Sequence, residues 1–192
     1  MRVLIAEDDP VIALGLETKL SALGHDVVAR VADGRRAVEE AARTQPDAVV
    51  MDVVMPGLDG LEAACAITRE RPVPIVAITA HDQPEYLERA IRCGVAAYLV
   101  KPVDGRQVER ALRLAVSRHR EFEAMRSEVG RLQEALETRR LVERAKGILM
   151  DRYGLPEGDA FLQIQRRARD TNRTMADIAR QLIDAAELLP PS

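Results

Sequence analysis

Aromatic residues are scarce in this 192-residue chain: they make up 3% of it, and Trp is absent. This scarcity excludes a core built on large rings, so we expect the interior to consist mainly of Val, Leu, Ile and Ala. The chain is 47% hydrophobic and 31% charged, which is the balance of a globular protein with enough apolar residues for a core.

Cysteine and long apolar runs are scarce as well. The two cysteines, Cys65 and Cys93, lie in helix-like stretches without metal-ligand spacing, so we expect neither a disulfide nor a zinc site. No apolar run is long enough to cross a bilayer, and the N-terminus lacks the basic-then-apolar pattern of a secretion signal. These absences indicate a reduced, soluble, cytoplasmic protein with no membrane partner.

Charge is distributed unevenly along the chain. Residues 1–104 hold 11 basic and 17 acidic residues, a net charge of −6, whereas residues 105–192 hold 17 basic and 14 acidic residues, a net charge of +3. An acidic first half and a mildly basic second half indicate two different functions.

Short apolar runs alternate with amphipathic stretches in the first 104 residues. Several of these runs are apolar on both sides of the strand period, as buried parallel strands are. Strand and helix alternate five times, which predicts an α/β fold with a five-stranded, doubly wound parallel sheet of the flavodoxin-like kind. We expect strands at 2–6, 26–30, 47–52, 74–79 and 96–100, and helices at 10–23, 34–44, 59–70 and 84–93.

The second half shows only helical patterns. No proline interrupts residues 103–155, and apolar residues recur there at steps of three and four, like a heptad seam with one short step. We expect a long helix over 105–136 that pairs with a second copy as a coiled coil rather than packing back on the first domain. The seam consists of Val108, Leu112, Ala115, His119, Phe122, Met125, Val129, Leu132 and Leu136.

Two further helical patterns follow, at 157–169 and 174–188. Gly154-Leu-Pro and Thr171-Asn-Arg separate them from what precedes. Together with the end of the long helix they predict a small three-helix unit. Phe161 is expected in its core.

Chemically useful side chains follow the ends of four predicted strands. They are Glu7 and Asp8, then Asp52, Thr79 and Lys101. In this sheet the carboxyl ends of these strands converge, so the five side chains should meet. Mg²⁺ prefers such oxygen ligands, and an aspartate can accept a phosphoryl group as an acyl phosphate. Lys101 and Thr79 would neutralise and hydrogen-bond that group.

Residues 2–118 resemble the receiver domain of bacterial two-component response regulators. The resemblance rests on IAEDDP, VVMDVVMPGLDG, AITA and YLVKP. It implies that a sensor histidine kinase phosphorylates Asp52, and that Thr79, Tyr98 and Lys101 form the switch. It also implies a cis Lys101-Pro102 peptide. The implied Mg²⁺ site consists of Glu7, Asp8, Asp52 and the carbonyl of Val54.

The position two residues after Asp52 bears on catalysis. A phosphatase that works through an aspartyl phosphate would want a second acid there, and this chain has Val54. We therefore expect a regulatory protein rather than an enzyme.

Basic residues cluster in the last third of the chain. A charge run alone is more often a solvated helix face than a nucleic-acid site. A DNA-reading helix-turn-helix is the competing class, because the joint at 170–174 is short enough for its turn. The candidate nucleic-acid contacts are Arg139, Arg140, Arg144, Lys146, Arg166, Arg167 and Arg173.

Residues 132–188 resemble the ANTAR domain, a three-helix RNA-binding antitermination module. The matching residues are Arg140, Val142, Ala145-Lys146-Gly147, Met150, Gly154, Ala160-Phe161, Arg166, Asn172 and Ala179. Receiver domain, coiled coil (105–136) and ANTAR domain in this order are similar to the actinobacterial, phosphorylation-dependent antitermination regulators.

That resemblance implies a transcription antiterminator whose partners are paired hairpins in nascent transcripts and RNA polymerase. It also implies a phosphorylation-dependent homodimer. A phosphorelay or protein-interaction module is the alternative from the residues themselves, followed by a DNA-binding response regulator.

Overall fold

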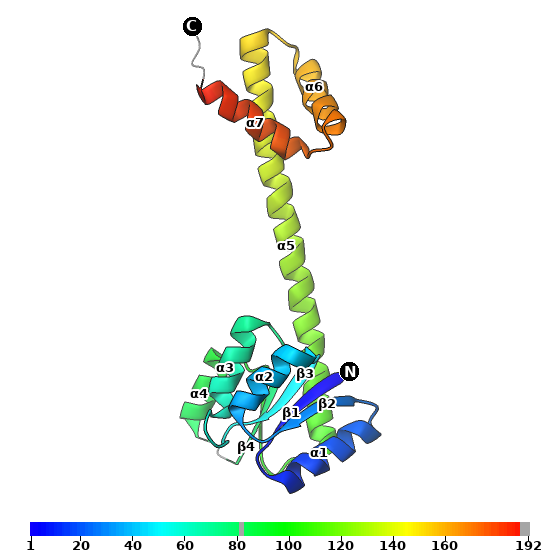
Figure 1. The fold of residues 1–192 in the computed structure, drawn as a ribbon, viewed down its shortest axis with the longest axis vertical. Coiled ribbons are helices and arrows are strands. Elements are labelled where there is room, and N and C mark those ends of the chain that lie inside the picture. Colours follow the sequence, from blue (N-terminus) through cyan, green and yellow to red (C-terminus); the bar gives the residue numbers. More distant parts are fainter. Residues whose placement is uncertain (81–82, 189–192) are drawn as a thin grey trace. The chain divides into compact units, whose positions relative to one another are not determined.

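The computed structural model describes residues 1–80 and 83–188, which form two compact units divided between Glu123 and Ala124. Strands and helices alternate in the first unit, and the second is helical (Figure 1). The first unit contains β1 (Arg2–Ala6), α1 (Pro10–Ala22), β2 (Asp26–Val31), α2 (Gly34–Thr44), β3 (Ala48–Asp52), α3 (Gly60–Glu70), β4 (Ile75–Thr79), α4 (Pro84–Arg92) and β5 (Ala97–Val100).

The five strands form one parallel sheet in the order β2-β1-β3-β4-β5, which confirms the predicted fold class. Alternate residues of each strand point to opposite faces and build two cores. Leu4 and Val49 face the layer of α2 and α3, whereas Val3 and Val50 face α1 and the start of α5. The core is aliphatic, as the composition predicts.

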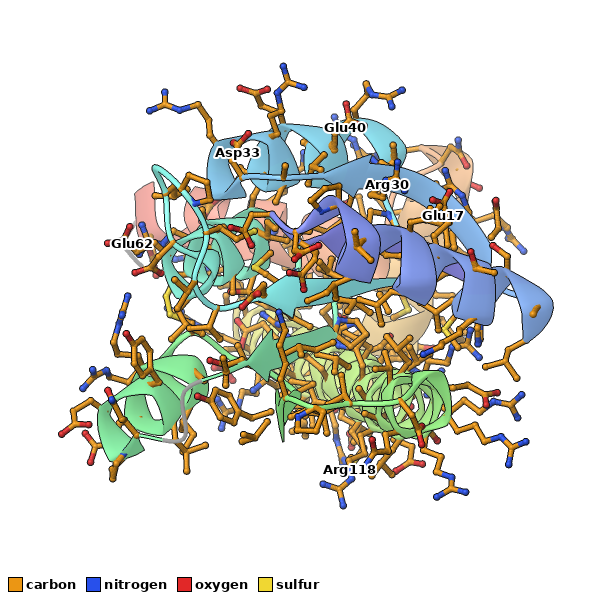
Figure 2. The ribbon with its side chains drawn as sticks, turned by 90° about the horizontal axis from the view of Figure 1, so that it is seen from below. Glu17, Arg30, Asp33, Glu40, Glu62 and Arg118 are labelled. Atoms are coloured by element: carbon orange, nitrogen blue, oxygen red, sulfur yellow. A yellow bond between two sulfur atoms is a disulfide. The ribbon has the colours of Figure 1, made fainter. Side chains whose placement is uncertain are left out.

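Aspartates begin three of the helices. Asp9, Asp33 and Asp59 each accept a backbone N–H of the following turn, so they satisfy donors that a helix start leaves unpaired. Charged side chains such as Glu17, Arg30 and Glu40 project from the outside of this unit (Figure 2). Capping thus explains Asp9, Asp33 and Asp59, and contact with solvent explains surface acids such as Glu17 and Glu40.

Helix α5 runs without a break from Gly105 to Tyr153, well past the predicted end at residue 136. The seam was predicted to pair with a second copy, and this was wrong for its first three positions, because Val108, Leu112 and Ala115 are buried in the core of the first unit. From Phe122 to Leu136 the seam is exposed. No helix within residues 1–80 and 83–188 has the length and apolarity that a membrane span needs.

The second unit packs the end of α5 against α6 (Glu157–Asp170) and α7 (Met175–Leu188). Thr174 and Asp177 cap the start of α7 reciprocally, since each side chain accepts the other's backbone N–H. Phe161 is 38% exposed, so its predicted core position was wrong. The core residue one position earlier on α6 is Ala160, which turns Phe161 partly toward solvent.

The two cysteines are joined, contrary to the expectation from sequence. Cys65 on α3 and Cys93 at the end of α4 form a disulfide, with their Cα atoms 4.4 Å apart. The 28-residue separation carries no metal or disulfide signature. Only the packing of α3 beside α4 brings the two side chains within bonding distance.

Candidate functional site: an acidic cup and a basic helical unit

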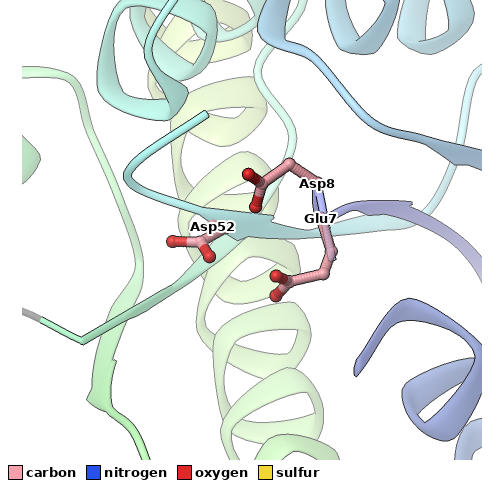
Figure 3. Close-up of side chains that lie close together, drawn as sticks. All are labelled: Glu7, Asp8 and Asp52. Carbon is pink, nitrogen blue, oxygen red and sulfur yellow. The ribbon is translucent and has the colours of Figure 1, made fainter. Parts of the chain in front are cut away.

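Three carboxylates meet at the carboxyl edge of the sheet. Glu7 and Asp8 follow β1, and Asp52 ends β3, the neighbouring strand in which Met51 pairs with Ala6. Figure 3 shows their carboxylates turned toward a common space. One oxygen of each lies within 4.8 Å of the others. The sequence prediction that these acids converge is thereby confirmed for Glu7, Asp8 and Asp52.

Lys101, which follows β5, lies beside this cluster of Glu7, Asp8 and Asp52, called the acidic cup below. Its Nζ donates to Oδ2 of Asp52 at 2.6 Å and to Oε2 of Glu7 at 2.9 Å. Both acids are buried, whereas Asp8 is exposed. A single cation thus faces two buried carboxylates, and the cup retains negative charge that a further cation can neutralise.

Burial sets the protonation of the cup. It raises the pKa of Glu7, and the neighbouring Asp52 adds to this, while Lys101 lowers the same pKa without cancelling the rise. Burial acts to lower the pKa of Lys101, but its hydrogen bonds to Asp52 and Glu7 outweigh it, so the pKa is raised. Lys101 therefore stays charged beside the acids.

The backbone around Asp52 is held closely. The N–H of Val54 donates to Oδ1 of Asp52 at 3.1 Å. Gly60 starts α3 directly against the end of β3, where a Cβ would lie 1.8 Å from the carbonyl oxygen of Asp52. Only glycine fits there. Hard carboxylate oxygens around one space fit Mg²⁺, with Glu7, Asp8 and Asp52 as the candidate ligands.

The remaining switch candidates line the neighbouring strands. Thr79 ends β4 and is fully buried, and its carbonyl oxygen accepts the N–H of Lys101 at 2.7 Å. Tyr98 pairs with Ala77 in the sheet and packs, half-buried, on the small core that includes Ala90 of α4. The Lys101-Pro102 peptide is cis, as the resemblance implies.

The basic residues of the second unit differ in exposure. Arg139 and Arg140 are exposed on α5, and Arg144 is paired there with Glu187 of α7. Lys146 is almost buried and donates to Glu143 and to Glu157 of α6. The predicted contacts on α6 and the following turn, Arg166, Arg167 and Arg173, are all exposed.

Sequence reasoning missed the partners of Lys146. Glu143 precedes it by three residues on the same helix, a spacing that could have indicated the contact. Glu157 lies beyond the Gly154 turn, and no local pattern predicts that pairing. These hydrogen bonds raise the pKa of Lys146, chiefly through Glu157, so the side chain is a fixed cation.

Family comparisons agree with both halves of this description. The model of the response regulator receiver domain matches residues 3–113, and the model of the ANTAR domain matches residues 130–183. The chain is 47% identical over 183 residues to the transcriptional regulatory protein PdtaR of Mycobacterium tuberculosis, covering 95% of this chain and 89% of PdtaR. The chain belongs to the response regulators with an ANTAR domain.

Two further similarities to this response regulator extend over about the length of its receiver domain. The transcriptional regulatory protein AfsQ1 of Streptomyces coelicolor is 36% identical over 116 residues, which cover 60% of this chain and 51% of AfsQ1. The signal receiver domain of a modulated diguanylate cyclase from Desulfovibrio desulfuricans is 33% identical, with a TM-score of 0.59 over 62% of this chain and 95% of that domain. The receiver fold is thus shared with proteins of different output.

Proposed function

We propose that this response regulator is phosphorylated on Asp52 by a sensor histidine kinase and then binds RNA hairpins in nascent transcripts as an antiterminator. The observation that carries the proposal is the convergence of Asp52, Glu7, Asp8 and Lys101 in a chain whose output region matches the ANTAR domain. Similarity to PdtaR over both domains supports the same reading. A cytoplasmic location belongs to the proposal, because transcripts are made there.

Phosphoryl transfer needs a nucleophile and positive charges that neutralise the phosphoryl oxygens. An Asp52 oxygen attacks the phosphorus of a phosphohistidine, the P–N bond breaks, and an acyl phosphate forms on Asp52. Lys101 lies 2.6 Å from Asp52 and offers its charge to the phosphoryl oxygens. Bound Mg²⁺, held by Glu7, Asp8, Asp52 and the Val54 carbonyl, would supply additional positive charge.

The new phosphoryl group would compete with Asp52 for Lys101. Thr79 ends the adjacent strand, and its hydroxyl is the candidate hydrogen-bond donor to the phosphoryl group. Tyr98 lies on the next strand and packs with Tyr86 and Ala90 of α4. A shift of Thr79 and Tyr98 toward the phosphoryl group would therefore reach α4.

RNA binding is proposed for the basic surface of the second unit. Arg139, Arg140, Arg166, Arg167 and Arg173 are exposed there, and guanidinium groups suit both phosphates and unpaired bases. Exposed Tyr153 and part-exposed Phe161 offer ring surfaces for stacking. Binding that relies on this many cations should weaken steeply with salt.

Dimerisation is proposed through the exposed part of α5. Phe122, Met125, Val129, Leu132 and Leu136 recur at steps of 3, 4, 3 and 4, and each is more than half exposed. A second copy of the same seam would bury them as a parallel coiled coil. Two ANTAR domains would then act together on paired hairpins.

A gel-shift series tests the proposed output. The full chain is titrated onto a two-hairpin RNA and onto duplex DNA of matched length, with and without acetyl phosphate. We expect tight binding to the RNA only, strengthened by acetyl phosphate. Tight binding to the duplex alone would identify a DNA-binding regulator, and binding to neither would identify a protein-interaction module.

A further inference from the structure

The disulfide occupies an accessible place in the receiver domain. Cys65 lies in the middle of α3, Cys93 is the residue at which α4 ends, and both are half-buried. They border an open cavity of about 410 Å³. A small oxidant, or the active site of a reducing protein, can therefore reach the sulfur atoms.

Positive charge dominates the lining of this cavity. Besides the two cysteines it is lined by Glu62, Ala66, Arg69, Arg89 and Arg92. Glu62, the single acid among these residues, projects outward from α3 (Figure 2). Arg89 is paired with Asp59 at 2.6 Å, whereas Arg69 and Arg92 form no ion pair with any residue of 1–80 or 83–188. Guanidinium groups beside a thiol favour the thiolate, which is the reactive form in disulfide chemistry.

The two cysteines remain neighbours without the covalent bond. The Thr68 hydroxyl lies 3.0 Å from the carbonyl oxygen of Cys93 and 2.8 Å from that of Ala64, which links α3 to the end of α4. The Arg89–Asp59 ion pair joins the same two helices further along. A reduced pair would therefore be positioned to close again.

We propose that Cys65 and Cys93 form a reversible thiol–disulfide site that a hydroperoxide closes and a dithiol protein opens. One thiolate attacks the hydroperoxide, the O–O bond breaks, and a sulfenic acid and an alcohol or water form. The second thiol attacks the sulfenic sulfur and releases water. Overall two thiols are oxidised and one hydroperoxide is reduced; thiol–disulfide exchange with a dithiol restores them.

The disulfide is attached to α4, a helix that packs on the core through few buried side chains. Ala90 is the one buried residue of α4 within its described span, so few core contacts hold this helix. Tyr86 and Ala90 of α4 share a small core with Tyr98. A closed bridge would fasten α4 to α3 and restrain any movement transmitted from Thr79 and Tyr98, a consequence that rests on the proposed function.

The proposed cytoplasmic location supports a reversible disulfide. In the proposed cytoplasmic location thiols are kept reduced, and the disulfides found there are mostly transient and redox-sensing. A permanent structural bridge would be out of place in that setting. Opening and closing with the oxidant level fits both the accessible cavity and its charge.

The test uses the full chain and needs no RNA. The protein is reduced with dithiothreitol, treated with hydrogen peroxide, quenched in acid and alkylated, and the alkyl groups are counted by mass spectrometry. We expect two alkyl groups after reduction and none after peroxide, with full reversal by thioredoxin. Two alkylated cysteines after peroxide, or a bridge that thioredoxin cannot open in the folded chain, would overturn the proposal.

Two further measurements separate reactivity from structure. Arg92→Gln should slow alkylation of the reduced chain by about threefold at neutral pH, whereas Arg30→Gln on β2, the strand at the opposite edge of the sheet from β5, should not. Amide exchange in α4 should be about tenfold faster in the reduced chain. Equal exchange in both redox states would refute the restraint on α4. None of these readouts depends on RNA binding or on Asp52 labelling, so failure here and failure of the proposed function remain distinguishable.

Discussion

Each domain contains a lysine that bridges two carboxylates, but burial is reversed between the two. Lys101 in the receiver domain joins Glu7 and Asp52, whose side chains are 2% and 8% exposed. Lys146 in the ANTAR domain is itself 8% exposed, whereas its partners Glu143 and Glu157 are 58% and 69% exposed. The receiver site thus buries its negative charge, and the ANTAR site buries its positive charge.

This reversal has a consequence for ligands. Buried acids are costly without compensating cations, so the proposed function has the receiver site accept Mg²⁺ and exchange Lys101 between a carboxylate and a phosphoryl group. Exposed acids lose little when they return to water, so Glu143 and Glu157 can give up Lys146 to an anion. A lysine paired with two carboxylates would then bind a cation in the receiver domain and an anion in the ANTAR domain.

The largest effect is expected from a variant of the buried acids in the receiver domain. Asp52→Asn should abolish labelling by a phosphohistidine donor or acetyl phosphate, because the nucleophilic oxygen is lost. The matched control is Asp9→Asn, since asparagine still caps α1 and Asp9 lies outside the carboxylate cluster. Undiminished acid-stable labelling of Asp52→Asn, measured on denatured protein, would place the phosphoryl group elsewhere.

Thr79→Ala should separate phosphorylation from output. Labelling of Asp52 should persist, because the hydroxyl acts on the phosphoryl group after it has arrived. RNA affinities with and without acetyl phosphate should then agree within about twofold. Lys101→Met, which removes the cation beside Asp52, should lower labelling without abolishing it and should also uncouple it from RNA binding. Full phosphorylation-dependent RNA binding by Thr79→Ala would show that the switch uses another residue.

Leu132→Lys tests whether α5 joins the two domains' activities through a dimer. A lysine in the exposed seam should leave Asp52 labelling intact, keep the phosphorylated chain monomeric and lower RNA affinity by about tenfold. Gln133→Lys adds the same charge one position off the seam and is the control. Light scattering beside the RNA titration gives both readouts; a stable monomer that binds RNA equally well in both states would end this proposal.

Lys146→Met sharpens the ANTAR half of the comparison. If RNA phosphate displaces the two exposed glutamates, this variant should lose several-fold in RNA affinity, and the salt dependence should fall by about one ion. Thermal unfolding should change little, because methionine fills the buried stem. Arg131→Gln removes a cation of α5 that lies outside the proposed contacts. An unchanged salt slope with a lower unfolding temperature would assign Lys146 a structural role alone.

The predictions from sequence succeeded where backbone topology decides the outcome. Strand ends of a parallel sheet meet at one edge, so Glu7, Asp8 and Asp52 could be placed together from their positions in the chain. Burial of Val108 and Leu112 could not be separated from the coiled-coil seam, because both environments want the same spacing. That seam's short step, near Phe122, is where packing on the sheet gives way to exposure.

Failures arose where two helix faces must be matched in space. Cys65 and Cys93 are bonded because α3 lies beside α4, and Lys146 meets Glu157 because α6 folds back along α5. Neither pairing follows from spacing along the chain. The side chain of Phe161 faces partly outward for a related reason: Ala160 and Ile164 already fill the contact with α5 and α7.

The smallest effect is expected from a buried histidine that, unlike Lys101 and Lys146, is not hydrogen-bonded to carboxylates. His25 is 8% exposed, and neither ring nitrogen has a hydrogen-bond partner among the described residues. Burial lowers its pKa below the model-peptide value of 6.5, and the positive Met1 amino group acts in the same direction. Glu109 opposes the shift, while Arg113 adds to it.

Neutral His25 is thus the native form, and its contribution to stability is present above pH 6.5 and disappears as the pH falls through the lowered pKa in the folded state. The unfolding temperature should therefore drop between about pH 7.5 and 5.5, by no more than about 3 °C from this residue. His25→Leu should flatten the profile, whereas His119→Leu, which also removes one histidine, should not. Identical slopes for wild type and His25→Leu, measured by calorimetry, would mean that the folded protein accommodates the imidazolium, for instance by swinging Glu109 away from Arg113 toward it. In that event His25 would join the two lysines as a third paired cation, and the contrast drawn from burial alone would no longer hold.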